Sequence, residues 1–246
     1  MKLPIALQLY TVRDETEKDM RGTLEKVAGM GYTGVEFAGF GGIPAQEMKA
    51  ELAKLGLKAV ASHTGIQLLR EKLDEEIEYN LEIGCKYIVC PSNRCESMDE
   101  FLEISEFFNT VGEKCRANGL RFGYHNHDFE FAKVDGEYYL DALFKRVSPA
   151  NLAAEIDTGW VFYAGIDPAE YVGKYKGRCP LLHVKDFLTR GEISFTEIGN
   201  GIIDTKAIIR AAEAAGTEWL IVEQDFSSRS TLESAKICFD NLSKLV

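Results

Sequence analysis

Five times along this chain, an amphipathic segment ends at a glycine and a short apolar run begins one to three residues later. The segments are KVAGMGYTGVEF, ELAKLGLKAVASH, LEIGCKYIVCPS, KCRANGLRFGYHNH and EAAGTEWLIVEQD. Glycine readily adopts the left-handed conformation that ends a helix, so each segment predicts a helix that turns directly into a strand. Repeated alternation of helices and strands implies a parallel sheet covered by helices.

Less clearly punctuated segments complete this pattern and bring it to eight strands alternating with eight helices. We expect strands at 4–9, 34–38, 58–63, 87–91, 121–127, 152–157, 179–185 and 219–225. A doubly wound open sheet is the competing arrangement, but it would usually carry a glycine-rich nucleotide loop after its first strand, and LQLYTVRDE offers none. The chain has 246 residues, close to the roughly 250 of a typical barrel. We therefore predict an α/β fold, a single (β/α)8 TIM barrel that forms one domain over residues 1–246.

The balance of charged residues argues against several classes of function. Asp and Glu outnumber Lys and Arg by 39 to 28, giving a net charge of −11, so a nucleic acid would be repelled. No run approaches the roughly 20 apolar residues of a membrane span, and the first apolar stretch is too short for a signal peptide. The six cysteines form no CxxC pair, which suits a reducing cytosol. We expect a soluble, cytoplasmic protein with no nucleic-acid or membrane partner.

Polar residues collect where the predicted strands end. In a barrel of this kind the loops that follow the strands build the active face, so these positions are the candidates for function. They hold all four histidines and three acidic residues: His63, His125, His127, His183, Glu36, Asp157 and Glu223. Any one of them alone could equally be a buried polar group satisfied by hydrogen bonds. Seven together favour a functional site.

A bound cation would account for this combination of residue types. Burying several carboxylates beside imidazoles costs several kcal/mol for each uncompensated ion unless a cation neutralises them. Neutral imidazole and carboxylate oxygen suit Mn²⁺, Zn²⁺, Co²⁺ or Fe²⁺ better than Ca²⁺, and the lack of cysteine at these positions argues against a structural zinc site. We expect a divalent metal cofactor, with Mn²⁺ or Zn²⁺ favoured.

Motifs at the later strand ends resemble those of a known family. In chain order they are YHNHDFEF, EIDTGW, LLHVKDF, IGNGIID and IVEQD. With them the chain resembles the xylose isomerase-like TIM barrel superfamily, in the sugar (phosphate) isomerase/epimerase branch that includes tagatose 3-epimerase and inosose dehydratase. The resemblance covers essentially the whole chain and implies one metal ligand from each of strands five to eight. Asp157, His183 and Glu223 match the last three of these ligands.

Strand five is where the sequence departs from the family pattern. Epimerases of the family have a metal-binding Glu at this place, whereas the nearest match here is His125, with His127 and Glu130 as the other candidates. On a regular strand His125 and His127 point the same way and Asn126 points the other way, so one histidine could bind metal while the other meets substrate. We favour His125 as the ligand.

The resemblance and the chemistry of a metal-polarised ketone suggest further roles. Such a metal acidifies the neighbouring C–H group, and Glu223 is the expected base. Glu130 or a neutral histidine would be the acid. Lys185 would steady an enolate oxygen, or else extend into solvent at the strand mouth. Substrate contacts are expected from Glu36, His63, His127 and Trp160.

These roles predict a metal-dependent isomerase or epimerase acting on a small sugar-like carbonyl compound. The alternative is a metal-dependent lyase or dehydratase acting on a keto-sugar or keto-inositol, including elimination from a 3-keto-glycoside. A non-enzymatic sugar-binding barrel would lack a competent base, and a three-metal endonuclease of the same superfamily would need more histidines and a positive face.

The substrate is expected to carry no phosphate. A turn with two glycines at 197–204, with Asp204 as the helix N-cap, could bind phosphate, but this signal is weak by itself. Basic residues are scarce near the strand ends. Family habit adds the expectation of a homodimer or homotetramer.

Overall fold

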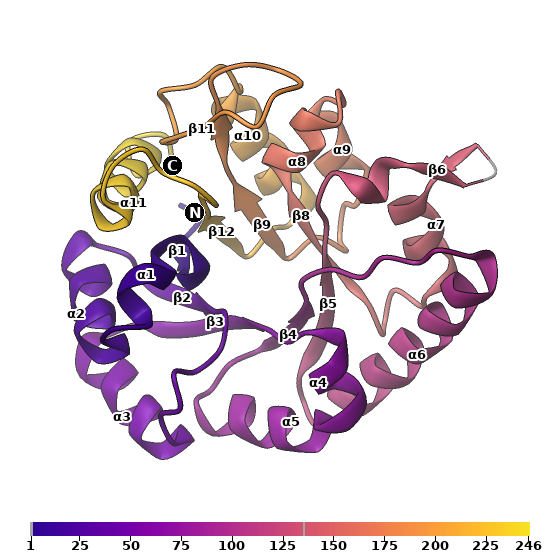
Figure 1. The fold of residues 1–246 in the computed structure, drawn as a ribbon, viewed down its shortest axis with the longest axis horizontal. Helices are drawn as coiled ribbons and strands as arrows, with labels where there is room; N and C mark the ends of the chain where they lie inside the picture. The colour runs from indigo at the N-terminus through magenta and orange to yellow at the C-terminus, as the bar shows by residue number, and fades with distance from the viewer. Residues whose placement is uncertain (1, 135) are drawn as a thin grey trace.

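In the computed structural model, which describes residues 2–134 and 136–246, eight parallel strands form a closed barrel. Each strand pairs with the next barrel strand along the chain, and the first pairs with the last (Figure 1). The barrel strands are β1 (Ile5–Gln8), β2 (Gly34–Phe37), β3 (Lys58–His63), β4 (Tyr87–Cys90), β5 (Arg121–His125), β8 (Ala153–Asp157), β9 (Leu181–Val184) and β12 (Trp219–Val222). All eight lie within the ranges predicted from the sequence, and the TIM barrel prediction is confirmed.

Helices surround the barrel, and the described residues hold more of them than the eight that were predicted (Figure 1). The α-helices are α1 (Arg13–Thr16), α2 (Met20–Met30), α3 (Ala45–Leu55), α4 (Ile66–Glu71), α5 (Leu73–Glu82), α6 (Met98–Ala117), α7 (Tyr139–Arg146), α8 (Thr158–Tyr163), α9 (Pro168–Lys174), α10 (Thr205–Ala215) and α11 (Thr231–Leu242). Two 3₁₀ turns are η1 (Leu9–Val12) and η2 (Phe129–Phe131), and two small ribbons pair β6 (Lys133–Val134) with β7 (Glu137–Tyr138) and β10 (Asp186–Phe187) with β11 (Phe195–Thr196). The additional helices are short segments in loops that follow barrel strands, where helical turns satisfy backbone groups that the sheet cannot.

The glycines at the five predicted junctions all have positive φ angles, between 68° and 108°: Gly31, Gly56, Gly84, Gly119 and Gly216. A side chain at this backbone conformation would be strained, which explains why glycine occurs there. Gly31, Gly56 and Gly216 are the C-caps of α2, α3 and α10, and β2, β3 and β12 begin two or three residues later. The helix-to-strand prediction is confirmed.

The interior of the barrel changes from apolar to polar along the strands. Early strand positions form a small apolar cluster inside the barrel: Ala6, Val60, Ala61, Tyr87, Val89, Leu181 and Ile221. Nearer the carboxyl ends, Gln8, Glu36, Glu155 and His183 are fully buried. The strand register aligns Gln8 with Glu36, His125 with Glu155, and Asp157 with His183. Pairing of the strands therefore gathers the polar residues into layers at one end of the barrel.

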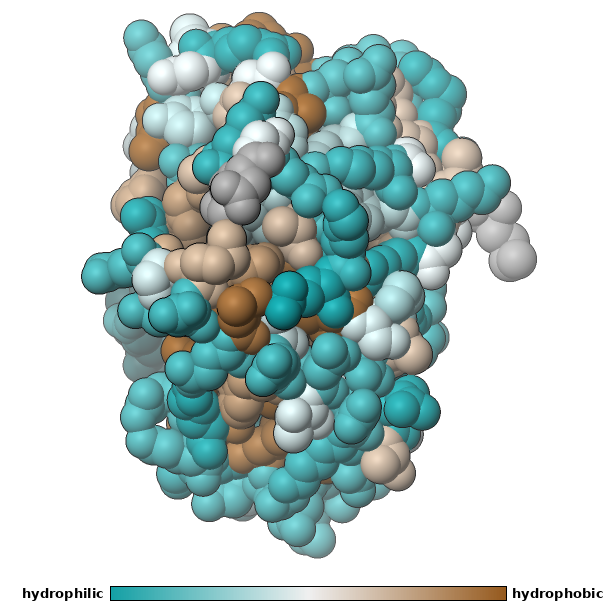
Figure 2. Space-filling model, turned by 90° about the vertical axis from the view of Figure 1, so that its right-hand side faces the viewer, coloured by the Kyte–Doolittle hydropathy of each residue, from teal (hydrophilic) through white to brown (hydrophobic). Residues whose placement is uncertain are grey.

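The outer surface differs from this interior. On the side of the molecule that Figure 2 shows, hydrophilic residues cover most of the surface and hydrophobic residues form small separate patches. Among the helices of the described residues, none combines the length and the apolar composition that crossing a membrane requires.

Candidate metal centre and active site

A cavity of about 400 Å³ lies at the carboxyl ends of the strands. Its walls come from the ends of six barrel strands: Tyr10, Ala38, His63, Pro91, Ser92, His125, His127, Glu223 and Asp225. Each of these residues ends its strand or lies just beyond it. The cavity thus occupies the face where active sites of this fold are found.

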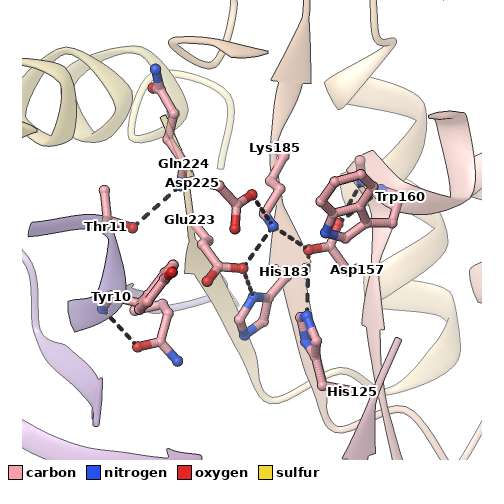
Figure 3. A network of polar contacts seen from close by, with 12 residues as sticks. Tyr10, Thr11, His125, Asp157, Trp160, His183, Lys185, Glu223, Gln224 and Asp225 are labelled. Atoms are coloured by element: carbon pink, nitrogen blue, oxygen red, sulfur yellow. Dashed lines mark hydrogen bonds and ion pairs between the residues drawn. The ribbon is translucent and has the colours of Figure 1, made fainter. Parts of the chain in front are cut away.

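The four predicted metal ligands form a compact cluster beside this cavity, which we call the outer group. One donor atom from each of His125, Asp157, His183 and Glu223 lies within 4.8 Å of the others. His183 Nδ1 is 2.9 Å from Glu223 Oε2, and His125 Nε2 is 3.7 Å from Asp157 Oδ2. Figure 3 shows the four side chains converging from the ends of different strands. Sequence positions spread over almost a hundred residues therefore meet at one point.

Asp157 is held in place by the start of helix α8. Its Oδ1 accepts hydrogen bonds from the backbone N–H groups of Gly159 (2.8 Å) and Trp160 (3.0 Å), as a helix N-cap does. The Asp157 backbone N–H donates to Asn126 Oδ1 at 3.0 Å. Asn126 is thereby turned toward β8, while His125 and His127 both line the cavity, as the strand alternation predicts. Asp157 keeps Oδ2 free of the helix cap and facing the outer group.

Lys185 supplies positive charge next to the outer group, and it does not extend into solvent. The side chain is 1% exposed, and its Nζ lies 2.8 Å from Asp157 Oδ2, 2.8 Å from Glu223 Oε2 and 2.6 Å from Asp225 Oδ2 (Figure 3). A Cβ on Gly159 would lie only 2.6 Å from Lys185 Cβ, so glycine makes room for the lysine. The ammonium therefore ties three carboxylates together.

Mutual attraction between these groups fixes their charges. Burial by itself would lower the pKa of Lys185, but Asp157, Glu223 and Asp225 outweigh it and raise this pKa well above its usual value. Burial would likewise raise the pKa of Glu223, but Lys185 and His183 hold it well below its usual range. For Asp225 burial dominates, with a contribution from the Glu223 charge, and its pKa is raised. Glu223 is thus the ionised carboxylate, and Asp225 the one that holds a proton more readily.

A second cluster, which we call the inner group, consists of Glu36, His63 and Glu155. His63 Nε2 lies 2.8 Å from Glu155 Oε2 and 3.4 Å from Glu36 Oε2. Glu36 Oε2 also accepts hydrogen bonds from Gln8 Nε2 at 2.8 Å and faces His183 Nε2 at 2.6 Å. Burial and the neighbouring Glu36 charge raise the pKa of Glu155 to about 7. His183 therefore stands between the two groups, with one ring nitrogen facing each.

The outer group fits a divalent cation by the chemistry of its donors. It offers two imidazoles and two carboxylates, a set that suits Mn²⁺ or Zn²⁺. Burial and the nearby His183 and His63 hold the pKa of His125 well below its usual value, so its imidazole is neutral, as a ligand must be. The short contact with Glu36 places a proton on His183 Nε2, and Nδ1, which faces Glu223 Oε2, is the nitrogen whose lone pair would bind the ion. Burial would lower the pKa of His183, but Glu155, Glu36 and Glu223 outweigh it and raise this pKa, so a bound ion would replace the proton between Nδ1 and Glu223.

Glu130 is not among the described residues that line the cavity. The side chain is fully buried, accepting a hydrogen bond from the Tyr124 hydroxyl at 2.8 Å and another from the His127 backbone N–H at 2.9 Å. Beyond His127 the chain turns into η2, which directs Glu130 toward Tyr124. These contacts hold the loop after β5, and the acid role expected for Glu130 stays a prediction.

Two predicted substrate contacts also lie behind the cavity wall. Glu36 is fully buried and contacts His183 Nε2, and the substrate contact expected for it stays a prediction. Trp160 is 8% exposed, and its ring lies 5.7 Å from that of His127 and 5.2 Å from Lys185 Nζ. Both positions support neighbouring residues, whereas His63 and His127 line the cavity as expected.

Sequence reasoning missed two carboxylates of the site. Asp225 was overlooked although it lies two residues beyond Glu223 in IVEQD, a spacing that places both on one side of an extended chain. Glu155 has the same relation to Asp157 in EIDTGW. In both cases the signal was available, because residues two apart on an extended chain point to the same side.

The glycine turn at 197–204 has a structural partner inside the protein. The backbone N–H groups of Gly199, Gly201 and Ile203 donate to the buried carboxylate of Asp186, at 2.9, 3.0 and 3.1 Å. The Asp204 side chain accepts from Ala207 N–H at the start of α10, as predicted for an N-cap. Because these N–H groups already bind a carboxylate, the turn does not present them to a phosphate.

Comparison with known proteins points to one family. The family model for the xylose isomerase-like TIM barrel matches residues 24–238. Inosose dehydratase of Geobacillus kaustophilus is 24% identical over 267 aligned positions, covering 91% of this chain and 86% of that protein.

Solved structures show the same fold. A sugar phosphate isomerase/epimerase from Parabacteroides distasonis superposes with a TM-score of 0.85 at 26% identity, covering 99% of this chain and 98% of that one. The IOLI protein with a bound zinc atom superposes with a TM-score of 0.79 at 14% identity, covering 99% and 98%. At that identity the second similarity concerns the fold alone.

Proposed function

Because this chain belongs to the xylose isomerase-like TIM barrel family, we propose that it is a divalent-metal-dependent carbon–oxygen lyase of the dehydratase type. Its substrate would be a small, unphosphorylated keto-sugar or keto-polyol. The reaction would remove a proton next to the ketone and expel the oxygen on the adjacent carbon. The position of Glu223 and Asp225 on the same side of the cavity carries this proposal.

The outer group, His125, Asp157, His183 and Glu223, would hold the metal. When bound, a divalent ion there supplies Lewis-acid polarisation of a substrate carbonyl, which acidifies the neighbouring C–H group. Mn²⁺ and Zn²⁺ both suit this set of donors. The inner-group residue Glu36 positions the His183 ring and so fixes which nitrogen faces the ion.

Glu223 and Asp225 have the properties of a base and an acid. Both line the cavity, from the end of one strand, and Lys185 Nζ bridges them at 2.8 and 2.6 Å. Their pKa values are pushed in opposite directions, which is how paired carboxyl groups divide acid and base roles. Glu223 Oε1, the oxygen not engaged by His183 and Lys185, would take the proton from carbon. The Asp225 carboxyl would then give a proton to the departing oxygen.

This arrangement favours proton removal and proton donation on one face of the substrate. Elimination with both events on the same face needs only neighbouring groups such as these. Epimerisation needs a second base on the opposite face, and the position where family epimerases have a metal-binding Glu is occupied by His125. Lys185 positions the two carboxyl groups and, because three carboxylates raise its pKa, keeps its own proton.

Isomerisation is the second candidate, since a proton can also return to the adjacent carbon from the same face. The similarity to the Parabacteroides distasonis protein described as a sugar phosphate isomerase/epimerase supports it. For either reaction an unphosphorylated substrate is supported by the cavity, where none of the described lining residues is Lys or Arg. The expected homodimer or homotetramer remains a proposal.

Incubation of the metal-loaded enzyme with a panel of keto-sugars and keto-inositols in D₂O tests this function. A lyase gives an enone, detected by ultraviolet absorbance and mass, whereas an isomerase gives a product of unchanged formula that carries deuterium. We expect Glu223→Gln to abolish deuterium exchange and Asp225→Asn to retain exchange while losing elimination. Asp204→Asn, which alters an exposed helix cap, is the matched control. Neither enone nor exchange across the panel would refute the proposal.

A further inference from the structure

We propose that the inner group, Glu36, His63 and Glu155, binds a second divalent cation. The three side chains come from β2, β3 and β8 and meet on the core side of the outer group. His63 Nε2 lies within 3.4 Å of both carboxyl groups, so one ion can reach all three. Two carboxylates and an imidazole are ligands that Zn²⁺ and Mn²⁺ accept, with a further position left open. This site goes beyond the proposed reaction, which does not require it.

Unpaired oxygen atoms mark the place for an ion. Glu36 Oε1 and Glu155 Oε1 are completely buried and have no hydrogen-bond partner within the described parts of the chain. An unsatisfied buried polar atom costs about 1–3 kcal/mol, and more when the group is charged. Glu36 Oε2 is already engaged by Gln8 and His183, so Oε1 is the oxygen left for the second ion. The two carboxyl groups that contact the His63 imidazole through Oε2 thus each keep a second, buried oxygen without a partner in the part of the chain that the structure describes.

The charge balance of the barrel mouth also favours two ions. Five carboxylates lie in the two groups and their contacts: Glu36, Glu155, Asp157, Glu223 and Asp225. Lys185 is the one ammonium in contact with them among the described residues. With neutral imidazoles and a proton on Asp225, the proposed acid, the other four carboxylates and Lys185 sum to −3, so one divalent ion leaves −1 and a second is needed to remove it. Uncompensated charge at this depth costs several kcal/mol per ion.

The two ions would not compete for the same atoms. His183 directs Nδ1 toward Glu223 of the outer group and Nε2 toward Glu36 of the inner group, so each place has its own nitrogen of this ring. The inner ion would use Glu36, His63 and Glu155, which are not among the four outer ligands, and it would be a close neighbour of the outer ion because Glu155 Oε2 lies 3.2 Å from His125 Nδ1 and 3.4 Å from His183 Nε2. Binding at the outer group fixes the His183 tautomer and thereby holds Glu36 in position for the inner ion.

A route for the ion exists through His63. This residue lines the main cavity and also a neighbouring cavity of about 420 Å³ beside the loop after β2. Its side chain is 10% exposed, whereas Glu36 and Glu155 are completely buried. His63 is therefore the ligand that an entering ion meets first.

Protons are the competing occupants of the inner group. Burial lowers the pKa of His63, but Glu36 and Glu155 outweigh it and the net pKa is raised. A protonated His63 and a protonated Glu155 could neutralise the group without an ion. The two states differ in the number of metal ions bound per chain, which can be measured directly.

The test is metal stoichiometry of the full chain. The protein is stripped with EDTA, dialysed against Zn²⁺ or Mn²⁺ alone, and its metal content is determined by plasma mass spectrometry. We expect two equivalents in the unaltered protein, one in His63→Gln, one in Glu155→Gln and one in Asp157→Asn, with Asp204→Asn retaining two. Circular dichroism checks that each variant is folded, and anomalous scattering at the zinc edge locates the ions in a crystal.

Each outcome separates this site from the outer one. One equivalent that survives in His63→Gln and Glu155→Gln but not in Asp157→Asn overturns the inner site and leaves the proposed function intact. One equivalent with the opposite pattern supports the inner site and overturns the assignment of the outer ligands. Two equivalents that both survive in His63→Gln and Glu155→Gln overturn the inner site, and no bound metal overturns both.

Discussion

Glu130 provides a quantitative test of how burial controls charge in this protein. Desolvation raises the pKa of this fully buried carboxyl from 4.5 to about 7, although the Tyr124 hydroxyl and the His127 N–H donate to it. Between these two pKa values the folded protein binds a proton that the unfolded chain releases. Because the folded state then holds more protons, stability must fall as pH rises through this range.

The size of the effect follows from the pKa difference. At about 1.4 kcal/mol per pKa unit, the change from 4.5 to about 7 is worth about 3 kcal/mol. Below pH 4.5 both states are protonated and Glu130 carries no penalty, whereas above about pH 7 the whole penalty is present. Glu130→Gln keeps an acceptor for the His127 N–H and a donor toward the Tyr124 oxygen without the charge. We therefore expect it to be up to about 3 kcal/mol more stable than the unaltered protein near pH 8, and similar near pH 5.

Urea unfolding of both proteins without metal, at several pH values between about 5 and 8, measures this difference. Glu106→Gln, at an exposed position of α6, is the control for loss of a carboxylate from the surface. If the free energies of unfolding of Glu130→Gln and the unaltered protein run parallel over this range, burial does not set the charge of Glu130 and the reasoning is refuted.

Three further predictions concern the site and the loop beside it. Lys185→Met leaves three buried carboxylates without their cation, so the metal-free protein should lose about 3–5 kcal/mol in urea unfolding; a loss below about 1 kcal/mol would show that the ammonium is dispensable. Zn²⁺ or Mn²⁺ at about 100 times its Kd should stabilise the stripped protein by about 2.7 kcal/mol in the same assay, and Asp157→Asn should reduce this gain; no gain with either ion would contradict metal binding. Gly201→Ala places a Cβ against the Asp186 carboxylate and the Phe187 carbonyl, so we expect a loss of about 1–3 kcal/mol, measured by thermal unfolding, and an unchanged Tm would show that the turn can shift.

Most of the fold could be predicted because its signals are local. A glycine such as Gly216 ends its helix through its own backbone conformation, and the apolar run that follows begins the strand. Five strands were predicted in this way and three from less clearly punctuated apolar segments, and closure of the barrel followed from their number and alternation. The number of helices was underestimated, because short turns such as α8 are induced by the loops over the barrel mouth and have little periodicity of their own.

The grouping of the site residues was also largely encoded in the sequence. His125, Asp157, His183 and Glu223 each stand at a strand end, and parallel strands of a barrel bring their carboxyl ends together. Position in the strand therefore predicts proximity. It does not predict whether a side chain reaches the cavity or lies behind its wall.

Tertiary structure decided the tasks of the remaining polar residues. Glu130 turns out of the cavity into a pocket formed by Tyr124, Glu36 lies beneath His183, and Lys185 joins Asp225 to the outer group. The sequence shows that a residue is Asp or Glu, whereas the charge of its carboxyl group and the oxygens left without a partner depend on residues that are distant in the chain. Sequence thus determined which residues come to the barrel mouth, and packing determined which of them remain available to bind an ion or move a proton, because burial and neighbouring charges act only through three-dimensional contacts.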